Sequence, residues 1–166
     1  PVPNDEHGQL SVEALEGLVD ERVKLIAVTH VPTNGGLVNP AAEIGRVARR
    51  HGIPYLLDAC QSVGQMPVDV EAIGCDMLSA TSRKFLRGPR GVGFLWVRSG
   101  FLDRLHPPFV ELESGDVGPT GFRLHDDRRR FETWEKNYAG IAGLGVAVRY
   151  ALDVGIEPIW DRIRAL

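Results

Sequence analysis

Short apolar runs of strand length, separated by helical patterns, most constrain what this chain can fold into. They lie at Leu25–Thr29, Tyr55–Leu57, Asp76–Ala80 and Val92–Val97. Continuous apolar runs are typical of strands that are covered on both faces, and helices between strands favour parallel pairing through right-handed crossovers. The sequence therefore predicts an α/β fold, with a mostly parallel sheet and helices on both faces.

Apolar faces of helical period and capping residues indicate the helices. Ser11 is suited to cap the first of them, and Pro40 is suited to the first position of the second. Small residues at the start of the longest helix imply close packing against a neighbouring backbone or partner. The predicted helices cover residues 11–19, 40–51, 68–73, 137–154 and 158–166. The stretch Pro107–Arg130 is rich in Pro, Gly and charge, and we predict a long surface segment there.

Composition excludes several classes of function. Lys and Arg number 19 against 22 Asp and Glu, and the net charge of −3 gives no basic excess for binding nucleic acid or an anionic membrane. No apolar stretch approaches the roughly 18 residues of a membrane span. Cys60 and Cys75 lack the spacing of a disulfide framework or metal site, so we expect core positions for both and a reducing, cytoplasmic setting. No histidine spacing indicates a metal.

Polar residues follow the predicted strands, and ligands of α/β sheets bind beyond the carboxyl ends of the strands. Asp58 directly follows an apolar strand, so we expect it either to have a cationic partner or to cap a nearby amide. Lys84 lies among Arg83, Arg87 and Arg90, and a lysine becomes a nucleophile where cations and desolvation favour its neutral amine. A surface lysine is the alternative.

Two further groups of polar residues are candidates. Thr81 and Arg83 combine a hydroxyl with a guanidinium, which suits a phosphate, although a plain polar loop explains them equally well. Gln61 and Thr33 are able to orient a ligand hydroxyl. His30 is able to stack on a flat ring or act as an acid, and a structural role is its alternative.

In order, the segments LIAVTHVPTNGGLVNP, HGIPYLLDACQSVGQMPVDV and GCDMLSATSRKFLRGPRGVGFLWV resemble the class V aminotransferase family. These are pyridoxal phosphate (PLP) enzymes of fold type I, and they include cysteine desulfurases, isopenicillin N epimerase-like proteins and C–S lyases. The motif at the centre of the resemblance is D-x-x-Q, followed by S-x-K-x-x-x-G-P-x-G-x-G. The resemblance implies that residues 1–155 are the central part of a PLP-binding large domain. Residues 156–166 would begin the connection to a C-terminal small domain that this chain lacks.

The resemblance also implies a role for each candidate residue. Lys84 would form a Schiff base with the aldehyde of PLP, and Asp58 would pair with its pyridinium nitrogen. Gln61 would lie beside the phenolic oxygen. Thr33 occupies a position where many members carry an asparagine that serves this oxygen or the substrate.

The phosphate of the cofactor would be bound by Thr81 and Arg83, at the positions of a Ser and a His in the desulfurases. His30 would lie on the substrate side. Desulfurases carry an E-x-G-T-x-N stretch whose threonine reaches the phosphate of the neighbouring subunit, whereas Glu132–Asn137 reads ETWEKN here. We therefore expect the epimerase-like or C–S lyase branch rather than a standard cysteine desulfurase.

We thus expect a PLP-dependent enzyme that acts on an amino acid, forms a homodimer when intact and is inactive as this chain alone. The alternative is a non-catalytic α/β binding or scaffold module that keeps only the fold. The sequence leaves open the substrate and the outcome of the reaction. Transamination, epimerisation, β-elimination and sulfur transfer are the alternatives.

Overall fold

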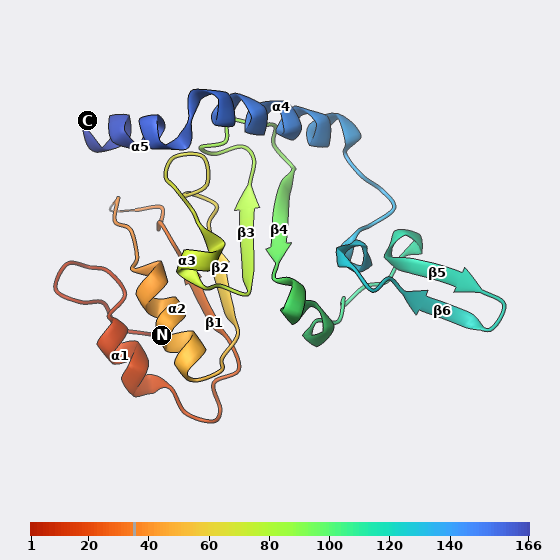
Figure 1. Cartoon of the computed structure of the whole chain (residues 1–166), viewed down its shortest axis with the longest axis horizontal. Coiled ribbons are helices and arrows are strands. Elements are labelled where there is room, and N and C mark those ends of the chain that lie inside the picture. The colour runs from red at the N-terminus through yellow and green to blue at the C-terminus, as the bar shows by residue number, and fades with distance from the viewer. Residues whose placement is uncertain (35) are drawn as a thin grey trace.

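A four-stranded sheet forms the centre of the computed structural model, which describes residues 1–34 and 36–166. Its strands are β1 (Ile26–Thr29), β2 (Tyr55–Asp58), β3 (Met77–Thr81) and β4 (Gly93–Val97), in that order across the sheet (Figure 1). β1, β2 and β3 are parallel, and β4 is antiparallel to β3. The predicted α/β fold and mostly parallel sheet are confirmed, and each strand falls on one of the apolar runs.

The helices α1 (Val12–Leu18), α2 (Ala41–Arg50) and α3 (Val70–Ile73) lie over one face of the sheet (Figure 1). α4 (Tyr138–Val154) and α5 (Ile156–Arg164) run across the carboxyl ends of the parallel strands. Ser11 caps α1 as predicted, with its Oγ accepting the N–H of Ala14 at 3.1 Å. Pro40 occupies the N-cap of α2 instead of the predicted first position. No single described helix is long and apolar enough to cross a membrane, whereas α4 and α5 together meet that criterion with a 73° bend between them.

The two faces of the sheet differ because successive strand residues point to opposite sides. The residues on the helix-covered face are buried with α1–α3 in one core, which includes Ile26, Val28, Tyr55, Leu57 and Leu78. On the opposite face Ala27, Thr29 and Leu95 are exposed. Within the described residues, the predicted helical layer is therefore present on one face only. The open face still carries the apolar side chains that are typical of a covered strand.

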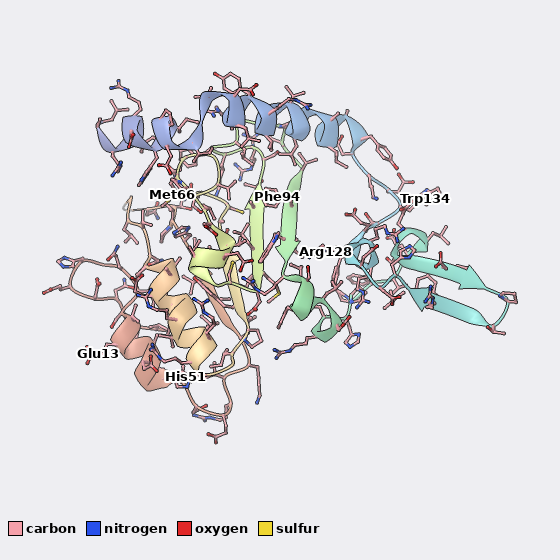
Figure 2. The ribbon with its side chains drawn as sticks, viewed as in Figure 1. Glu13, His51, Met66, Phe94, Arg128 and Trp134 are labelled. Atoms are coloured by element: carbon pink, nitrogen blue, oxygen red, sulfur yellow. The ribbon has the colours of Figure 1, made fainter. Side chains whose placement is uncertain are left out.

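The connection from β4 to α4 contains a feature that the sequence did not predict. A small antiparallel hairpin, β5 (Gly115–Gly118) and β6 (Gly121–Leu124), projects from the surface segment (Figure 1). Arg128, labelled near the base of this segment in Figure 2, donates to the Val97 carbonyl from Nε at 3.1 Å and from Nη2 at 2.9 Å. This contact ties the segment to the end of β4.

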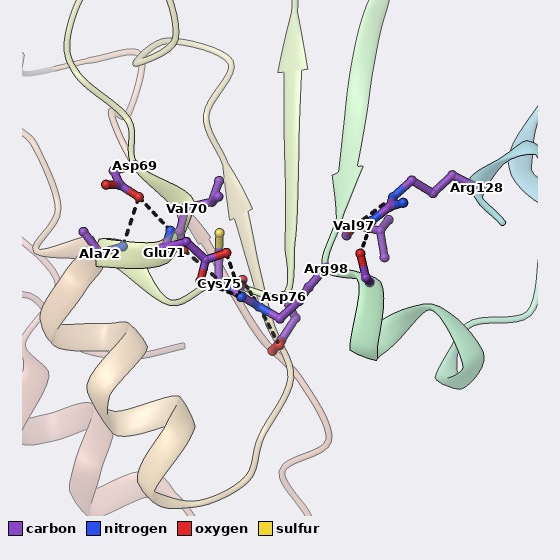
Figure 3. A network of polar contacts seen from close by, with 10 residues as sticks. Asp69, Val70, Glu71, Ala72, Cys75, Asp76, Val97, Arg98 and Arg128 are labelled. Atoms are coloured by element: carbon purple, nitrogen blue, oxygen red, sulfur yellow. Dashed lines mark hydrogen bonds and ion pairs between the residues drawn. The ribbon is translucent and has the colours of Figure 1, made fainter.

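Arg98 fastens the same strand to α3 on its other side (Figure 3). Its Nη1 donates to both carboxylate oxygens of Glu71, at 2.9 and 2.8 Å. Its Nε and Nη2 donate to the Cys75 carbonyl at 3.2 and 3.0 Å. The segment before β3 is thus cross-linked to the end of β4, at the side of the sheet opposite to the carboxyl ends of the parallel strands.

Candidate functional site

The site begins with Asp58, the last residue of β2. Asp58 pairs in register with Thr29 of β1 and Ser79 of β3, so the three side chains share the open face of the sheet. Asp58 is half-buried, and its Oδ1 accepts the backbone N–H of Cys60 at 2.9 Å. A carboxylate has room for further donors beyond one N–H. Asp58 is therefore presented toward the space above the open face.

The lysine loop, residues 82–92, leaves β3 beside this acid. Its ends are closed by hydrogen bonds from the Ser82 N–H to the Val92 carbonyl at 3.1 Å and from the Gly88 N–H to the Ser82 carbonyl at 2.9 Å. The buried Ser82 hydroxyl also donates to the Pro89 carbonyl. Within the loop, the Arg87 N–H donates to the Lys84 carbonyl at 2.9 Å, and Arg87 itself has φ +60°. The half-buried Lys84 is thus carried on a tightly closed turn.

The thiol of Cys60 is influenced by charges from both β2 and the lysine loop. Burial raises the pKa of this thiol, and so do the hydrogen bond and the charge of Asp58. The charge of Lys84 and the backbone N–H of Thr81 act on the same thiol in the opposite direction and lower its pKa. The electrostatic environment of Cys60 therefore depends on groups at the ends of β2 and β3.

Cys60 is also the residue that sequence reasoning missed. The predicted core position is confirmed for Cys75, which is fully buried. It is wrong for Cys60, which is half-buried within the site. The signal was its place in D-A-C-Q, two residues after Asp58 and one before Gln61.

Gln61 and Thr33 are brought together from different loops. The Gln61 Nε2 donates to the Val31 carbonyl at 3.2 Å and to the Thr33 Oγ1 at 3.4 Å. The Gln65 side chain donates to the Gln61 carbonyl and holds its backbone. The predicted pair of polar groups beside Asp58 therefore exists as a unit.

His30 does not lie with the other candidate residues on the open face of the sheet. It follows Thr29, points away from the open face and is 5% exposed. Its Nδ1 has no hydrogen-bond partner among the described residues, and burial lowers its pKa, which favours the neutral ring. Its backbone donates to the Asp58 carbonyl at 2.9 Å and accepts the Asn39 N–H at 2.8 Å. The structure thus gives His30 a part in shaping the loop, and its predicted place on the substrate side stays a prediction.

The charges of the site are unpaired in the described part of the chain. Neither Asp58 nor Lys84 forms an ion pair within 4 Å there, and the same holds for the exposed Arg83. The expected cationic partner of Asp58 is therefore absent, because a half-buried carboxylate on an open face keeps much of its hydration. An unpaired acid, an unpaired amine, a half-buried Thr81 and an exposed guanidinium make a donor and acceptor set that fits PLP.

Several cavities adjoin the lysine loop, and two of them bear on the candidate site. One of about 420 Å³ lies between the loop and α5, and Lys84, Gln65 and Ile159 are among its lining residues. The other, of about 370 Å³, lies between β4 and α4, and Met66 and Phe94 lie beneath α4 there (Figure 2). The second cavity is apolar and includes none of the predicted site residues in its lining. The predicted site residues therefore lie outside this apolar cavity, at the strand ends and in the lysine loop.

Comparisons with known proteins identify the family of the chain. The family model described as aminotransferase class-V matches residues 1–166. A probable cysteine desulfurase from Methanothermobacter thermautotrophicus is 39% identical over 161 residues, which is 95% of this chain and 40% of that protein. A cysteine desulfurase from Yersinia pestis is 38% identical over 157 residues, covering 92% of this chain and 38% of that protein.

Solved structures give the same result. The apo structure of a cysteine desulfurase from Thermococcus onnurineus matches with a TM-score of 0.86 and 32% identity, over 94% of this chain and 39% of that one. A complex of the cystine C–S lyase C-DES with its product cysteine persulfide matches with a TM-score of 0.80 and 30% identity, over 87% of this chain and 39% of that one. The chain spans about 40% of the length of the curated relatives described above.

Proposed function

Because this chain belongs to the class V aminotransferase family, we propose that its strand ends form the lysine-bearing and acid-bearing part of a PLP site acting on a sulfur-containing amino acid. The observation that carries the proposal is the register of β2 with β3, because it places Asp58 on the open face beside the strand from which the loop with Lys84 leaves. PLP has a pyridine nitrogen and an aldehyde, so its site requires an acid for the nitrogen and an amine for the aldehyde. PLP, when bound, supplies the aldehyde and an electron-accepting ring.

Each residue then has a task at a stated atom. The Lys84 Nζ would hold the cofactor and would move the proton at the substrate Cα. The Asp58 carboxylate keeps the ring nitrogen protonated. The joined Gln61 and Thr33 orient the phenolic oxygen, and Thr81 and Arg83 bind the phosphate.

The substrate class is supported by the relatives. Those named above are cysteine desulfurases and a cystine C–S lyase, and a further solved structure, SspA in complex with cysteine, matches with a TM-score of 0.66 and 32% identity. We favour the C–S lyase or epimerase-like branch, because Trp134 and Glu135 replace the Gly-Thr of the desulfurase stretch. The Trp134 N–H donates to the Glu111 carboxylate at 2.8 Å, which fixes this stretch to its own surface segment. A homodimer in a reducing, cytoplasmic setting belongs to the same proposal.

Cofactor trapping tests the proposal. The intact protein is mixed with PLP, its absorbance near the visible–ultraviolet boundary is recorded, and borohydride reduction followed by peptide mass mapping locates the labelled lysine. We expect the label on Lys84 and its loss in Lys84→Ala. Lys24→Ala is the control, because the Lys24 ammonium donates to the Glu21 carbonyl on an exposed turn.

Each other outcome has a meaning. An absorbance band that persists unchanged in Lys84→Ala shows that Lys84 is not the cofactor lysine. Absence of any band in the intact protein favours the non-catalytic α/β module. If PLP is bound, assays of sulfide, persulfide and changed Cα configuration, with cysteine, cystine and cysteine sulfoxides beside sulfur-free amino acids, separate lyase, desulfurase and epimerase.

A further inference from the structure

We infer that Arg87 is a positioning residue for Lys84, because it holds the turn that carries this lysine against α4. The inference rests on the proposed function, in which the Lys84 amine holds PLP, and it adds a residue that the predicted ligand set lacks. Arg87 stands three residues after Lys84 and is exposed. Its role follows from its backbone conformation and from the contact that its side chain makes.

The backbone of Arg87 has a conformation that favours glycine. Its φ is +60°, and no other non-glycine residue has a positive φ in the described part of the chain. The Arg87 N–H donates to the Lys84 carbonyl at 2.9 Å. Directly after it, the Gly88 N–H donates back to the Ser82 carbonyl at 2.9 Å. A glycine at position 87 would form this reversal without strain, so an arginine there indicates a task for the side chain.

The side chain of Arg87 joins the lysine loop to α4. Its guanidinium lies over the ring of Tyr150, with 5.4 Å between the Cζ atom and the ring centroid. A cation is attracted to the face of an aromatic ring. Arg87 and Tyr150 also line one cavity, of about 730 Å³, whereas Arg87 and Lys84 line the cavity of about 420 Å³ beside α5. Arg87 therefore lies between Lys84 and the helix that crosses the strand ends.

The contact with the ring acts on the lysine through the turn. Without it, the left-handed backbone loses an interaction that offsets its strain, and the turn from Lys84 to Arg87 opens more often. At an exposed site such a contact changes an equilibrium about two- to fivefold. Each opening moves the backbone of Lys84, so its amine is less often in place to react with an aldehyde.

The first test needs no cofactor. Hydrogen exchange over residues 82–92 is measured in the intact apo protein and corrected for intrinsic rates. It should quicken about two- to fivefold in Arg87→Met, which keeps a long side chain without the charge. Arg87→Lys, which keeps a cation, should recover most of the protection. Arg104→Ala is the matched control and should leave the loop unchanged, because the Arg104 guanidinium lies over the Phe101 ring at 4.8 Å, in the 3-10 helix after β4.

Variants of Tyr150 test the other half of the contact. Tyr150→Phe keeps an aromatic face and should leave the exchange of the lysine loop unchanged. Tyr150→Leu should quicken this exchange as much as Arg87→Met does. The double variant should be no faster than either single variant, because both substitutions remove the same contact. Additive effects of the two substitutions would show that Arg87 and Tyr150 act separately and would overturn the inference.

PLP trapping connects the turn to the chemistry. The rate at which PLP becomes trappable on Lys84 by borohydride should fall about two- to fivefold in Arg87→Met and should recover in Arg87→Lys. If wild type and Arg87→Met trap PLP on Lys84 at the same rate, the inference is overturned and the proposed function stands. If the wild type traps no PLP on Lys84, both fail. Equal slowing in Arg87→Lys and Arg87→Met would assign Arg87 a packing role only and would also overturn the inference.

Discussion

Replacing Gly64 by alanine tests how the lysine loop is held. Gly64 has φ +92°, and a Cβ there would lie 2.6 Å from both the Leu86 nitrogen and the Phe85 carbonyl carbon. A left-handed conformation costs an L-residue about 1–2 kcal/mol, and forcing backbone out of such a contact costs about 1–3 kcal/mol more. We expect Gly64→Ala to lower the free energy of unfolding by about 2–5 kcal/mol, as measured by urea denaturation of the intact protein.

Gly52→Ala is the matched control. Gly52 has φ +64°, and no heavy atom lies within 4 Å of the position its Cβ would take. Only the backbone cost of about 1–2 kcal/mol applies to it. Hydrogen exchange over residues 82–92 should quicken in Gly64→Ala alone, and PLP trapping on Lys84 should fall with it. Equal destabilisation in the two variants, with unchanged exchange in the loop, would refute the reasoning.

Further predictions concern single groups. Asp58→Asn should still allow PLP to be trapped on Lys84 but should abolish most turnover, because a neutral amide does not keep the ring nitrogen protonated; turnover near the wild-type rate would contradict this role. Tyr55→Phe should leave the free energy of unfolding unchanged or raise it by up to about 1 kcal/mol, because the buried hydroxyl has no hydrogen-bond partner among the described residues. A clear decrease of this free energy in urea denaturation would show that the hydroxyl has a partner. The pKa of Glu16 is lowered from its ordinary value of 4.5, first by the hydrogen bond from His51 and then by that from Arg50. Its stabilising contribution is therefore present above pH 4.5 and is lost as the pH falls through the folded-state pKa, so the stability difference between wild type and Glu16→Gln should shrink in urea titrations below that pH.

The sequence predicted those parts of the fold in which local pattern and tertiary environment agree. Each strand of the main sheet is an apolar run, and Ser11 caps its helix as its side chain suggests. The hairpin escaped prediction because Gly115–Gly118 and Gly121–Leu124 have little apolar alternation and few β-branched residues. The pairing of these two strands is stabilised by backbone hydrogen bonds and by the turn between them. Hydrophobic periodicity indicates neither of these.

The sequence predicted those candidate residues whose side-chain chemistry distinguishes them. It missed the residue that only its position distinguishes. Asp58 and Lys84 stand out as an acid and an amine at strand ends. Cys60 has no such mark, because a cysteine is most often a small core residue. Its partial exposure depends on how the chain continues beyond β2, which a sequence pattern does not give. The opposite directions of Asp58 and His30 likewise follow from strand register.

The lysine loop is finally placed by two elements distant from it in sequence. On one side Gly64 allows the backbone of Phe85 and Leu86 to approach. On the other, a Cβ at Gly143 of α4 would lie 2.6 Å from the Pro89 ring, so a small residue is required where the helix crosses the loop. The predicted close packing at the start of α4 is confirmed here, and it acts on the loop that carries Lys84. Because the loop is held from both sides, the backbone that carries Lys84 has a defined place beside the ends of the strands.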